Sequence, residues 1–348
     1  MFQKVLLLKT VKLAKIPNSD ASQMIPGLLG LGIIERSAKI SKMGDFRLIP
    51  IADGKEDEFS QMGYEIIEGP AYTIERRSPQ ERILEAMSDI PPEIRSKLPL
   101  KWESVGDVII LRMDDICSPY KERIGKTYAN ILEADTVCAD IHGVSGEFRK
   151  PSMEVLYGDR TESVRLENGI RYDFDVRKVM FASGNTDERY RMREQDCSGE
   201  TVVDMFAGIG YFTLPIAKFT GARKVFACEK NPESYEFLLR NIKLNGVEDT
   251  VVPILGDNRY IPGKRFADRI LMGYVQTTSE FIPKALDMIK PGGLIHYHDT
   301  FYVNEYERKI RGLFEDMCGD DGFKIELIRE VKSFAPSVSH YVADIRIL

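Results

Sequence analysis

The pattern of apolar and polar positions along the chain changes near residue 181. Beyond that point, five apolar runs of strand length are separated by helix-length segments such as NPESYEFLLRNIKLN and SEFIPKALDMIK. Continuous apolar strands that alternate with helices are typical of a parallel sheet covered on both faces. The runs are TVVDMF, ARKVFACE, TVVPILGD, ADRILMGYV and GGLIHYHD. We therefore predict a doubly wound α/β sheet here, and such sheets bind ligands beyond the carboxyl ends of their strands.

Two smaller α+β zones precede this sheet. The first mixes short β-like runs with a helix-like stretch, SQMIPGLLGLGII, and ends at a polar helix, SPQERILEAM. The bend DIPPEIRSKLP, with paired prolines, then indicates a linker. The second zone has a strand, GDVIILRM, a helix, YKERIGKTYANILEAD, and alternating runs typical of a β-meander. Because 348 residues exceed what one core usually covers, we predict three domains, at 1–88, 93–178 and 179–348.

Composition, cysteine spacing and net charge indicate where the protein acts and which ligands it binds. No apolar run reaches the roughly 18 residues of a membrane span, and the N-terminus lacks a small-residue cleavage site, so we expect a cytoplasmic protein without a membrane partner. Five cysteines form no C-x-x-C pair, which argues against a disulfide framework and a metal site. The net charge of −6 does not favour nucleic acid, but a basic patch can lie on an acidic protein. We also expect a monomer.

A glycine turn follows the first strand of the predicted sheet and opens a helix. Its residues are Ala207-Gly208-Ile209-Gly210, within the run VVDMFAGIGYFTLPIA. The glycines allow the backbone to turn tightly and to approach a ligand closely. A dinucleotide site would show G-x-G-x-x-G, but the third glycine is replaced by Thr213. The sequence therefore indicates a ligand without a diphosphate.

Polar residues end the first three strands in the expected order. Asp204 ends the first strand, and Glu229, twenty-five residues later, can accept both hydroxyls of a ribose. Asp257 and Asn258 follow the third strand, where a carboxylate beside an amide can read the exocyclic amine of adenine. Each residue alone could cap a turn or lie in solvent. Together they predict a site for S-adenosylmethionine, an adenosine without diphosphate, and Phe206 in the turn is included in it.

At this point the residues carry a family resemblance. The chain resembles the archaeal and eukaryotic tRNA guanosine N1-methyltransferases that act beside the anticodon, and their siblings, the wybutosine-pathway aminocarboxypropyltransferases. The resemblance covers roughly residues 100–348 and implies a Rossmann-like, S-adenosylmethionine-dependent methyltransferase-like sheet preceded by smaller α+β domains, with S-adenosylmethionine as co-substrate and tRNA as partner. Its runs include VLYGDRT, FDVRKVMFASGNTDERYR, NIKLNGV, GGLIHYHDT and VKSFAPSVSHYVADI. The first zone resembles, more loosely, the domain with which the methyltransferases touch the tRNA elbow, and the middle domain is expected to position the tRNA.

Two stretches distinguish the siblings. After the fourth strand the methyltransferases carry an Asn-Leu-Pro or Asn-Pro-Pro element, where this chain has Met272-Gly273-Tyr274-Val275. Upstream they read Ser/Asn-Pro-Arg, where this chain has Phe181-Ala182-Ser183-Gly184-Asn185. The second form resembles the aminocarboxypropyl branch, which usually has two serines before the glycine. The resemblance therefore implies that Ala182 and Ser183 contact the cofactor and that Asn185 belongs to the catalytic group.

The resemblance leads to three hypotheses. The first is transfer of the 3-amino-3-carboxypropyl group to the ring carbon of 4-demethylwyosine, the tricyclic base beside the anticodon of tRNA-Phe. This reaction needs a cation on the methionine carboxylate, and Arg189 can bind it bidentately. Glu188 matches the general base of the methyltransferases and is expected to orient or deprotonate the substrate. The alternatives are methylation of the guanosine at the same nucleotide, and a tRNA-binding protein without catalysis.

Overall fold

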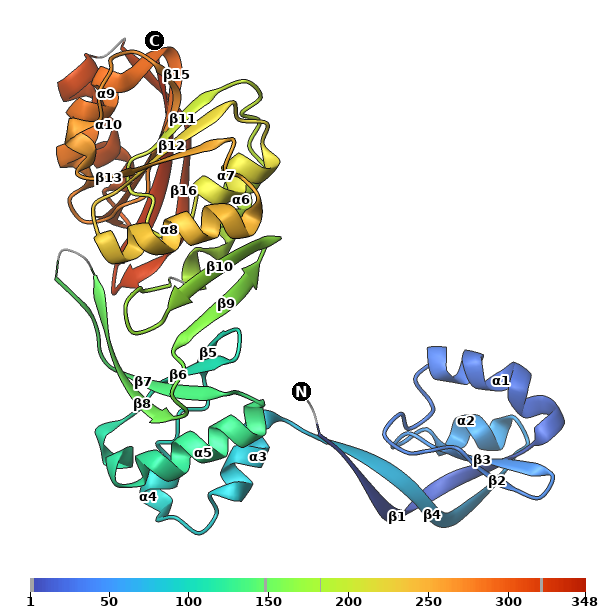
Figure 1. Cartoon of the computed structure of the whole chain (residues 1–348). Coiled ribbons are helices and arrows are strands. Elements are labelled where there is room, and N and C mark those ends of the chain that lie inside the picture. Colours follow the sequence, from blue (N-terminus) through green and yellow to red (C-terminus); the bar gives the residue numbers. More distant parts are fainter. Residues whose placement is uncertain (1–2, 147–148, 182, 320–321) are drawn as a thin grey trace. The chain divides into compact units, whose positions relative to one another are not determined.

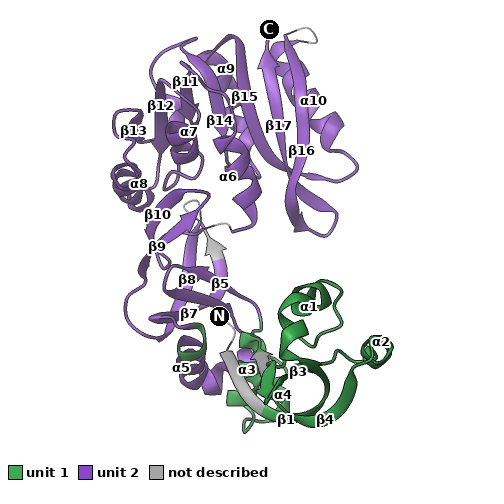
Figure 2. Ribbon diagram, turned by 90° about the vertical axis from the view of Figure 1, so that its right-hand side faces the viewer, with its two compact units in different colours: residues 1–100, 130–132 green, residues 101–129, 133–348 purple. Residues whose placement is uncertain are grey.

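The computed structural model describes residues 3–146, 149–181, 183–319 and 322–348 (Figure 1). The chain divides into two compact units, residues 1–100 with 130–132, and residues 101–129 with 133–348 (Figure 2). The three-domain division at 1–88, 93–178 and 179–348 is finer than this and stays a prediction. No helix of the described residues is long and apolar enough to cross a membrane.

The first unit is built on a four-stranded antiparallel sheet in the order β2-β3-β1-β4. Its helices α1 and α2 cover an apolar core that contains Ile16, Leu28 and Phe59. The polar helix predicted at SPQERILEAM is α3, and it begins with a capping box in which Ser78 and Glu81 satisfy each other's backbone N–H groups. The elements are β1 (Gln3–Pro17), α1 (Asn18–Gly30), β2 (Ser41–Met43), β3 (Phe46–Pro50), α2 (Glu56–Gln61), β4 (Glu65–Arg77), α3 (Pro79–Ala86) and α4 (Pro92–Arg95).

The second unit begins with two small sheets. One has the order β5-β6-β7-β8, in which β6 and β7 are parallel and joined through helix α5; the other is the hairpin β9-β10. The alternating runs expected to form one meander are therefore split, because β8 pairs with β7 and not with β9. The elements are β5 (Trp102–Val105), β6 (Val108–Arg112), α5 (Lys121–Leu132), β7 (Thr136–Ser145), β8 (Lys150–Tyr157), β9 (Glu162–Glu167) and β10 (Ile170–Asp175).

A seven-stranded sheet in the order β13-β12-β11-β14-β15-β17-β16 forms the rest of this unit (Figure 1). The five runs predicted as parallel strands are β11 to β15, and their parallel pairing confirms the prediction. Two further strands, β17 and β16, continue the sheet in antiparallel pairing. The elements are α6 (Thr186–Arg193), β11 (Thr201–Asp204), α7 (Thr213–Phe219), β12 (Lys224–Glu229), α8 (Pro232–Asn245), β13 (Val251–Leu255), β14 (Ala267–Met272), α9 (Ile282–Met288), β15 (Ile289–Tyr302), α10 (Tyr306–Cys318), β16 (Phe323–Ala335) and β17 (Val338–Ile347).

Apolar cores lie on both faces of this sheet. Neighbouring residues of β11 point to opposite faces, so Val202 packs in the core with α7 and α8, and Val203 packs in the core with α9 and α10. Both faces are therefore covered, as the continuous apolar strands predicted. The carboxyl ends of the parallel strands meet at one edge of the sheet, and the candidate site lies there.

Candidate active site

A cavity of about 420 Å³ lies at the carboxyl ends of the parallel strands. This is within the roughly 300–1,000 Å³ of small-molecule sites. Its lining includes the glycine turn, the residues that follow β12, β13 and β14, the beginning of α6, and parts of β16 and β17. The predicted site residues that line it are Asn185, Arg189, Phe206, Gly208, Glu229, Asp257 and Asn258. The structure therefore brings together residues that the sequence separates by more than seventy positions.

The glycine turn depends on backbone geometry that other residues rarely adopt. Gly208 has φ of 56°, and a Cβ there would lie 2.6 Å from the ring of Tyr211. Gly210 has φ of 102°, and a Cβ there would lie 2.6 Å from Leu214. Gly208 lines the cavity, whereas Gly210, at the end of the turn, is buried and is not among the described residues that line the cavity. Both glycines are needed for the turn, but only Gly208 faces the site within the described residues.

Glu229 fastens the turn to the end of β12. Its Oε2 accepts a hydrogen bond from the Gly208 backbone N–H at 2.7 Å, and its Oε1 accepts one from the Asn231 N–H at 2.7 Å. Burial raises the pKa of this carboxyl, and the backbone donors oppose that shift. Each carboxylate oxygen has a further lone pair, and the side chain lines the cavity. Glu229 can therefore hold the turn and accept hydroxyls of a ligand at the same time.

Asp204 lies beneath the turn and is fully buried. It accepts hydrogen bonds from the Thr213 hydroxyl at 2.7 Å and from the Phe206 backbone N–H at 3.2 Å. Burial raises the pKa of the Asp204 carboxyl to about 6. Asp204 is not among the described residues that line the cavity. Its role as a cofactor ligand stays a prediction, and its hydrogen bonds position the turn.

The residues after β13 face the cavity beside the turn. Asn258 donates from Nδ2 to the Met205 carbonyl at 2.8 Å, while its Oδ1 is buried without a hydrogen-bond partner. A buried acceptor without a partner is costly, so this oxygen is available to a donor on a ligand. Asp257 accepts two hydrogen bonds from the Arg259 guanidinium, at 2.9 and 2.6 Å, and one from the Arg259 backbone N–H at 3.1 Å, which hold the pKa of its carboxyl well below the usual range.

Aromatic rings form an apolar wall of the cavity. Phe206 stacks on Tyr274, with ring centroids 5.1 Å apart and planes 15° apart. Phe281 meets Phe206 edge-on, with centroids 4.9 Å apart. All these rings line the cavity. A flat apolar wall of this kind suits a purine ring, because aromatic side chains bury flat ligands well.

Asn185 and Arg189, just before and within helix α6, supply polar groups to the cavity. Asn185 lines the cavity, and its Oδ1 is buried without a hydrogen-bond partner. Arg189 is 2% exposed, and its Nε donates to Glu167 Oε1 at 2.5 Å. Its guanidinium lies 4.5 Å from the centre of the Phe181 ring. Arg189 is therefore a fixed cation on the cavity wall rather than a surface arginine.

The remaining predicted residues lie away from the cavity lining, as far as the structure describes it. Ser183 donates from Oγ to Glu103 Oε1 at 3.0 Å. Glu188 is fully buried, and its carboxylate pairs with Arg191 at 2.8 Å and with Arg329. Ala182 lies outside the described residues. The roles expected for these residues stay predictions.

Several cavity residues were not proposed as site residues from the sequence, and three of them carry titratable groups beside Arg189. Lys332 of β16, His340 of β17 and Arg149 line the same cavity. Burial, with repulsion from Arg149 and Arg189, lowers the pKa of Lys332. A Cβ at Gly184 would lie 3.0 Å from Lys332 Cδ, so the glycine leaves room for the lysine. The run VKSFAPSVSHYVADI contained Lys332 and His340, but no spacing in it indicated chemistry.

Family models match consecutive parts of the chain. The TYW2 N-terminal domain matches residues 81–161, and the TRM5/TYW2 methyltransferase domain matches residues 163–327. A tRNA(Phe) (4-demethylwyosine(37)-C(7)) aminocarboxypropyltransferase from Pyrococcus horikoshii is 45% identical over 269 residues, which are 76% of this chain and 96% of that protein. The chain belongs to the TRM5/TYW2 family.

Solved structures extend this assignment. The crystal structure of P. horikoshii TYW2 in complex with MeSAdo is 42% identical, with a TM-score of 0.69 over 77% of this chain and 99% of that chain. Wild-type Trm5b from Pyrococcus abyssi is 31% identical, with a TM-score of 0.79 over 97% of this chain and 99% of that chain. The methyltransferase-like α/β fold is thereby confirmed. The Trm5b match also reaches into the part of the chain before residue 81.

Proposed function

We propose that this protein transfers the 3-amino-3-carboxypropyl group of S-adenosylmethionine to the ring carbon of 4-demethylwyosine, next to the anticodon of tRNA(Phe). The observation that carries the proposal is that Arg189, Arg149 and Lys332 line the same cavity as Glu229 and Asn258. The first three can hold a carboxylate and the last two can hold an adenosine. A relative named for this reaction is 45% identical to the chain.

The cavity fits the adenosine part of the co-substrate. Glu229 has lone pairs for the ribose hydroxyls, and the buried Asn258 Oδ1 lacks a partner that the adenine amine would supply. Phe206 and Tyr274 offer a stacked apolar wall for the purine. When it is bound, S-adenosylmethionine supplies a sulfonium that activates each of its attached carbons toward a nucleophile.

The choice among those carbons depends on which one is held in line with the nucleophile, within about 3.5 Å. Transfer of the aminocarboxypropyl group requires the methionine part to lie toward the base, with its carboxylate fixed. Arg189, already immobilised by Glu167 and Phe181, can donate to a carboxylate, and Lys332 and Arg149 add positive charge on the same wall. This wall supports the aminocarboxypropyl reaction over the methyl reaction.

Methylation of the guanosine at the same nucleotide is the second candidate, because the Trm5b comparison spans nearly the whole chain. The element after β14 argues against it. Gly273 replaces the Asn-Pro element expected of the methyltransferases, and a Cβ at Gly273 would lie 2.7 Å from the ring of Phe212. A side chain at this position would require Phe212 to move. A tRNA-binding role without catalysis is disfavoured by the predicted cofactor residues that do line the cavity, among them Glu229, Asp257 and Asn258.

We further propose that residues 1–88 contact the body of the tRNA, that residues 93–178 position the anticodon region, and that the protein acts in the cytoplasm as a monomer. The support is the sequence pattern and the comparison with Trm5b, which also covers the first unit. Sedimentation at several concentrations checks the monomer, since a mass that rises with concentration contradicts it.

A labelling experiment tests the reaction. Wyosine-precursor tRNA is incubated with S-adenosylmethionine labelled either in the methyl group or in the carboxyl carbon. We expect only the carboxyl label in tRNA, with methylthioadenosine as the nucleoside product. Methyl label in the tRNA, together with S-adenosylhomocysteine, would identify a methyltransferase. Binding of tRNA without binding of S-adenosylmethionine, measured by titration, would support the role without catalysis.

A further inference from the structure

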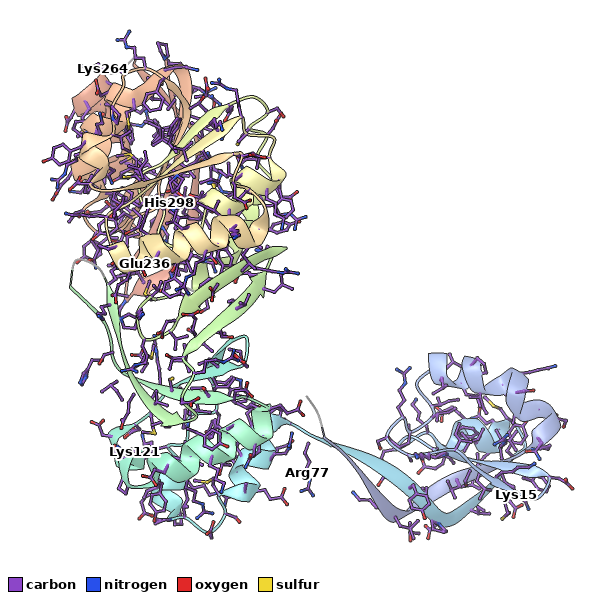
Figure 3. The ribbon with its side chains drawn as sticks, viewed as in Figure 1. Lys15, Arg77, Lys121, Glu236, Lys264 and His298 are labelled. Carbon is purple, nitrogen blue, oxygen red and sulfur yellow. The ribbon has the colours of Figure 1, made fainter. Side chains whose placement is uncertain are left out.

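Two histidines connect the cavity to the buried carboxylate of Glu188. His340 of β17 lines the cavity and is 4% exposed. Its Nε2 lies 3.0 Å from Nδ1 of His298, and Nε2 of His298 lies 3.7 Å from Glu188 Oε1. His298 belongs to β15 and lies in the interior of the unit (Figure 3). The chain of groups runs from the cavity wall to a carboxylate that does not itself line the cavity within the described residues.

The order of groups assigns the protons. Nε2 of His298 has no hydrogen-bond partner among the described residues, but Glu188 Oε1 lies 3.7 Å from it, and a nearby carboxylate favours the proton of the ring on this nitrogen. Nδ1 of His298 is then an acceptor, and Nε2 of His340 donates to it. In a neutral imidazole one ring nitrogen carries the proton and the other has the free lone pair. Because Nε2 of His340 is the donor, its Nδ1 is the nitrogen that can accept a proton. The same logic operates wherever a carboxylate fixes the tautomer of a general-base histidine.

The surroundings keep both rings neutral. Burial lowers the pKa of His298 and of His340 to about 3, so both are unprotonated bases near neutral pH. The groups that face them are Arg191, His296, Asp344 and Arg329 around His298, and Lys332, Glu188 and Arg149 around His340. Phe212 stacks on the His298 ring with centroids 5.3 Å apart, which fixes its plane.

The proposed reaction needs such a base. When the ring carbon of the tricyclic base attacks the CH₂ group, the new C–C bond forms and the C–S bond breaks, and methylthioadenosine leaves with the electron pair. The ring carbon then carries both the new substituent and its original hydrogen, and the ring has become cationic. Loss of that hydrogen as a proton returns the C–H electron pair to the ring. Such a cation is strongly acidic, so even a weak base is sufficient.

We propose that His340 accepts this proton at Nδ1 and releases it to solvent, with two positioning residues: His298, whose Nδ1 fixes the tautomer of His340, and Glu188, whose carboxylate favours its charged form. The proposal rests on the proposed function, because the proton that His340 accepts is the hydrogen of the ring carbon that receives the aminocarboxypropyl group. It gives Glu188 an indirect role, through two imidazoles, in place of direct contact with the substrate.

The experiment measures single-turnover transfer to 4-demethylwyosine tRNA with hydrogen or deuterium on the acceptor carbon. Wild-type protein is tested first for entry of the carboxyl label, and failure there contradicts the proposed function rather than the role of His340. We expect His340→Gln to transfer roughly 100-fold more slowly, as for loss of a general base. Its affinity for S-adenosylmethionine and its melting temperature should stay near wild type, and the deuterium effect should be larger than in wild type.

Further variants test the positioning residues. His298→Asn keeps an acceptor for His340 and should retain most of the rate, whereas His298→Leu should lose it and change the pH profile. Imidazole added to His340→Ala should restore part of the transfer. His142→Gln removes an exposed histidine outside the cavity lining and serves as the matched control. A wild-type rate for His340→Gln, a loss explained by weakened cofactor binding, or an unchanged isotope effect would overturn the proposal.

Discussion

Replacing Glu229 by Gln changes one atom at the point where the glycine turn, β12 and the proposed ribose site meet. In the structure each carboxylate oxygen accepts one backbone N–H, from Gly208 and from Asn231, at 2.7 Å. The amide oxygen of Gln can keep one of these bonds. The amide nitrogen then faces the other N–H as donor against donor, and it no longer presents a charged acceptor to ribose hydroxyls.

The two losses have separate magnitudes. A hydrogen bond to a charged acceptor contributes roughly 1.5–3 kcal/mol, so the affinity for S-adenosylmethionine should fall about ten- to a hundredfold. A buried N–H left without an acceptor costs about 1–3 kcal/mol, so the free energy of unfolding should also decrease. Because the turn is fastened by Glu229 even without a ligand, we expect both effects from one substitution.

Calorimetry of S-adenosylmethionine binding, with thermal unfolding of the same samples, checks the expectation. Glu236→Gln on α8 (Figure 3) is the matched control, since Glu236 is exposed and is not among the described residues that line the cavity. Unchanged affinity in folded Glu229→Gln protein would refute the assignment of this carboxylate to the ribose. Reduced affinity with unchanged stability would instead show that the backbone contacts contribute little.

The remaining predictions concern the buried carboxyl, the cationic wall and the first unit. Burial raises the pKa of Asp204 from an ordinary value of 3.8 to about 6, so the folded state binds this proton more tightly than the unfolded state does. The free energy of unfolding should therefore fall by roughly 2–3 kcal/mol as the pH rises from about 4 to 6. Denaturant titrations across that pH range should show this decrease in wild type and its loss in Asp204→Asn. Arg189→Ala should lower the melting temperature as well as transfer, because it leaves Glu167 buried without its partner, while Arg189→Ala with Glu167→Gln should recover stability but not transfer. Residues 1–80 precede the part of the chain that matches the family models. Removing them should weaken the binding of whole tRNA more than the binding of an anticodon stem-loop, measured by titration at several salt concentrations. Equal losses of affinity for the two RNAs would contradict a contact with the tRNA body.

The parallel sheet and one side of the cavity could be predicted because their signals are local. Each strand is a continuous apolar run, and Glu229 at the end of β12 and Asn258 after β13 line the cavity, as their positions predicted, whereas Asp204 at the end of β11 does not. Helix α6 could not be interpreted in this way. Its sequence is almost wholly polar, yet Glu188 and Arg189 are buried, because Glu167 and Arg329 from distant strands supply their partners.

Lys332 and His340 lay beyond sequence reasoning for a different reason. Both reach the cavity from antiparallel strands that extend the sheet past its parallel part, and nothing near them in the chain indicates that edge. The hydrogen bond between His298 and His340 likewise joins residues forty-two positions apart. Such pairs depend on strand register, which hydrophobic periodicity leaves open when a strand is buried on both faces.

The sheet order carries a consequence for how the protein assembles. Strands β16 and β17 are joined by only two residues, Pro336 and Ser337, and pair as an antiparallel hairpin, so this ladder can form locally. The hairpin joins the parallel part of the sheet through β17, which pairs with β15. Lys332 and His340 both belong to the hairpin, so the wall that they form is in place only after β17 has added to β15. A refolding chain should therefore gain capacity for transfer only after the amides shared by β15 and β17 are protected from hydrogen exchange.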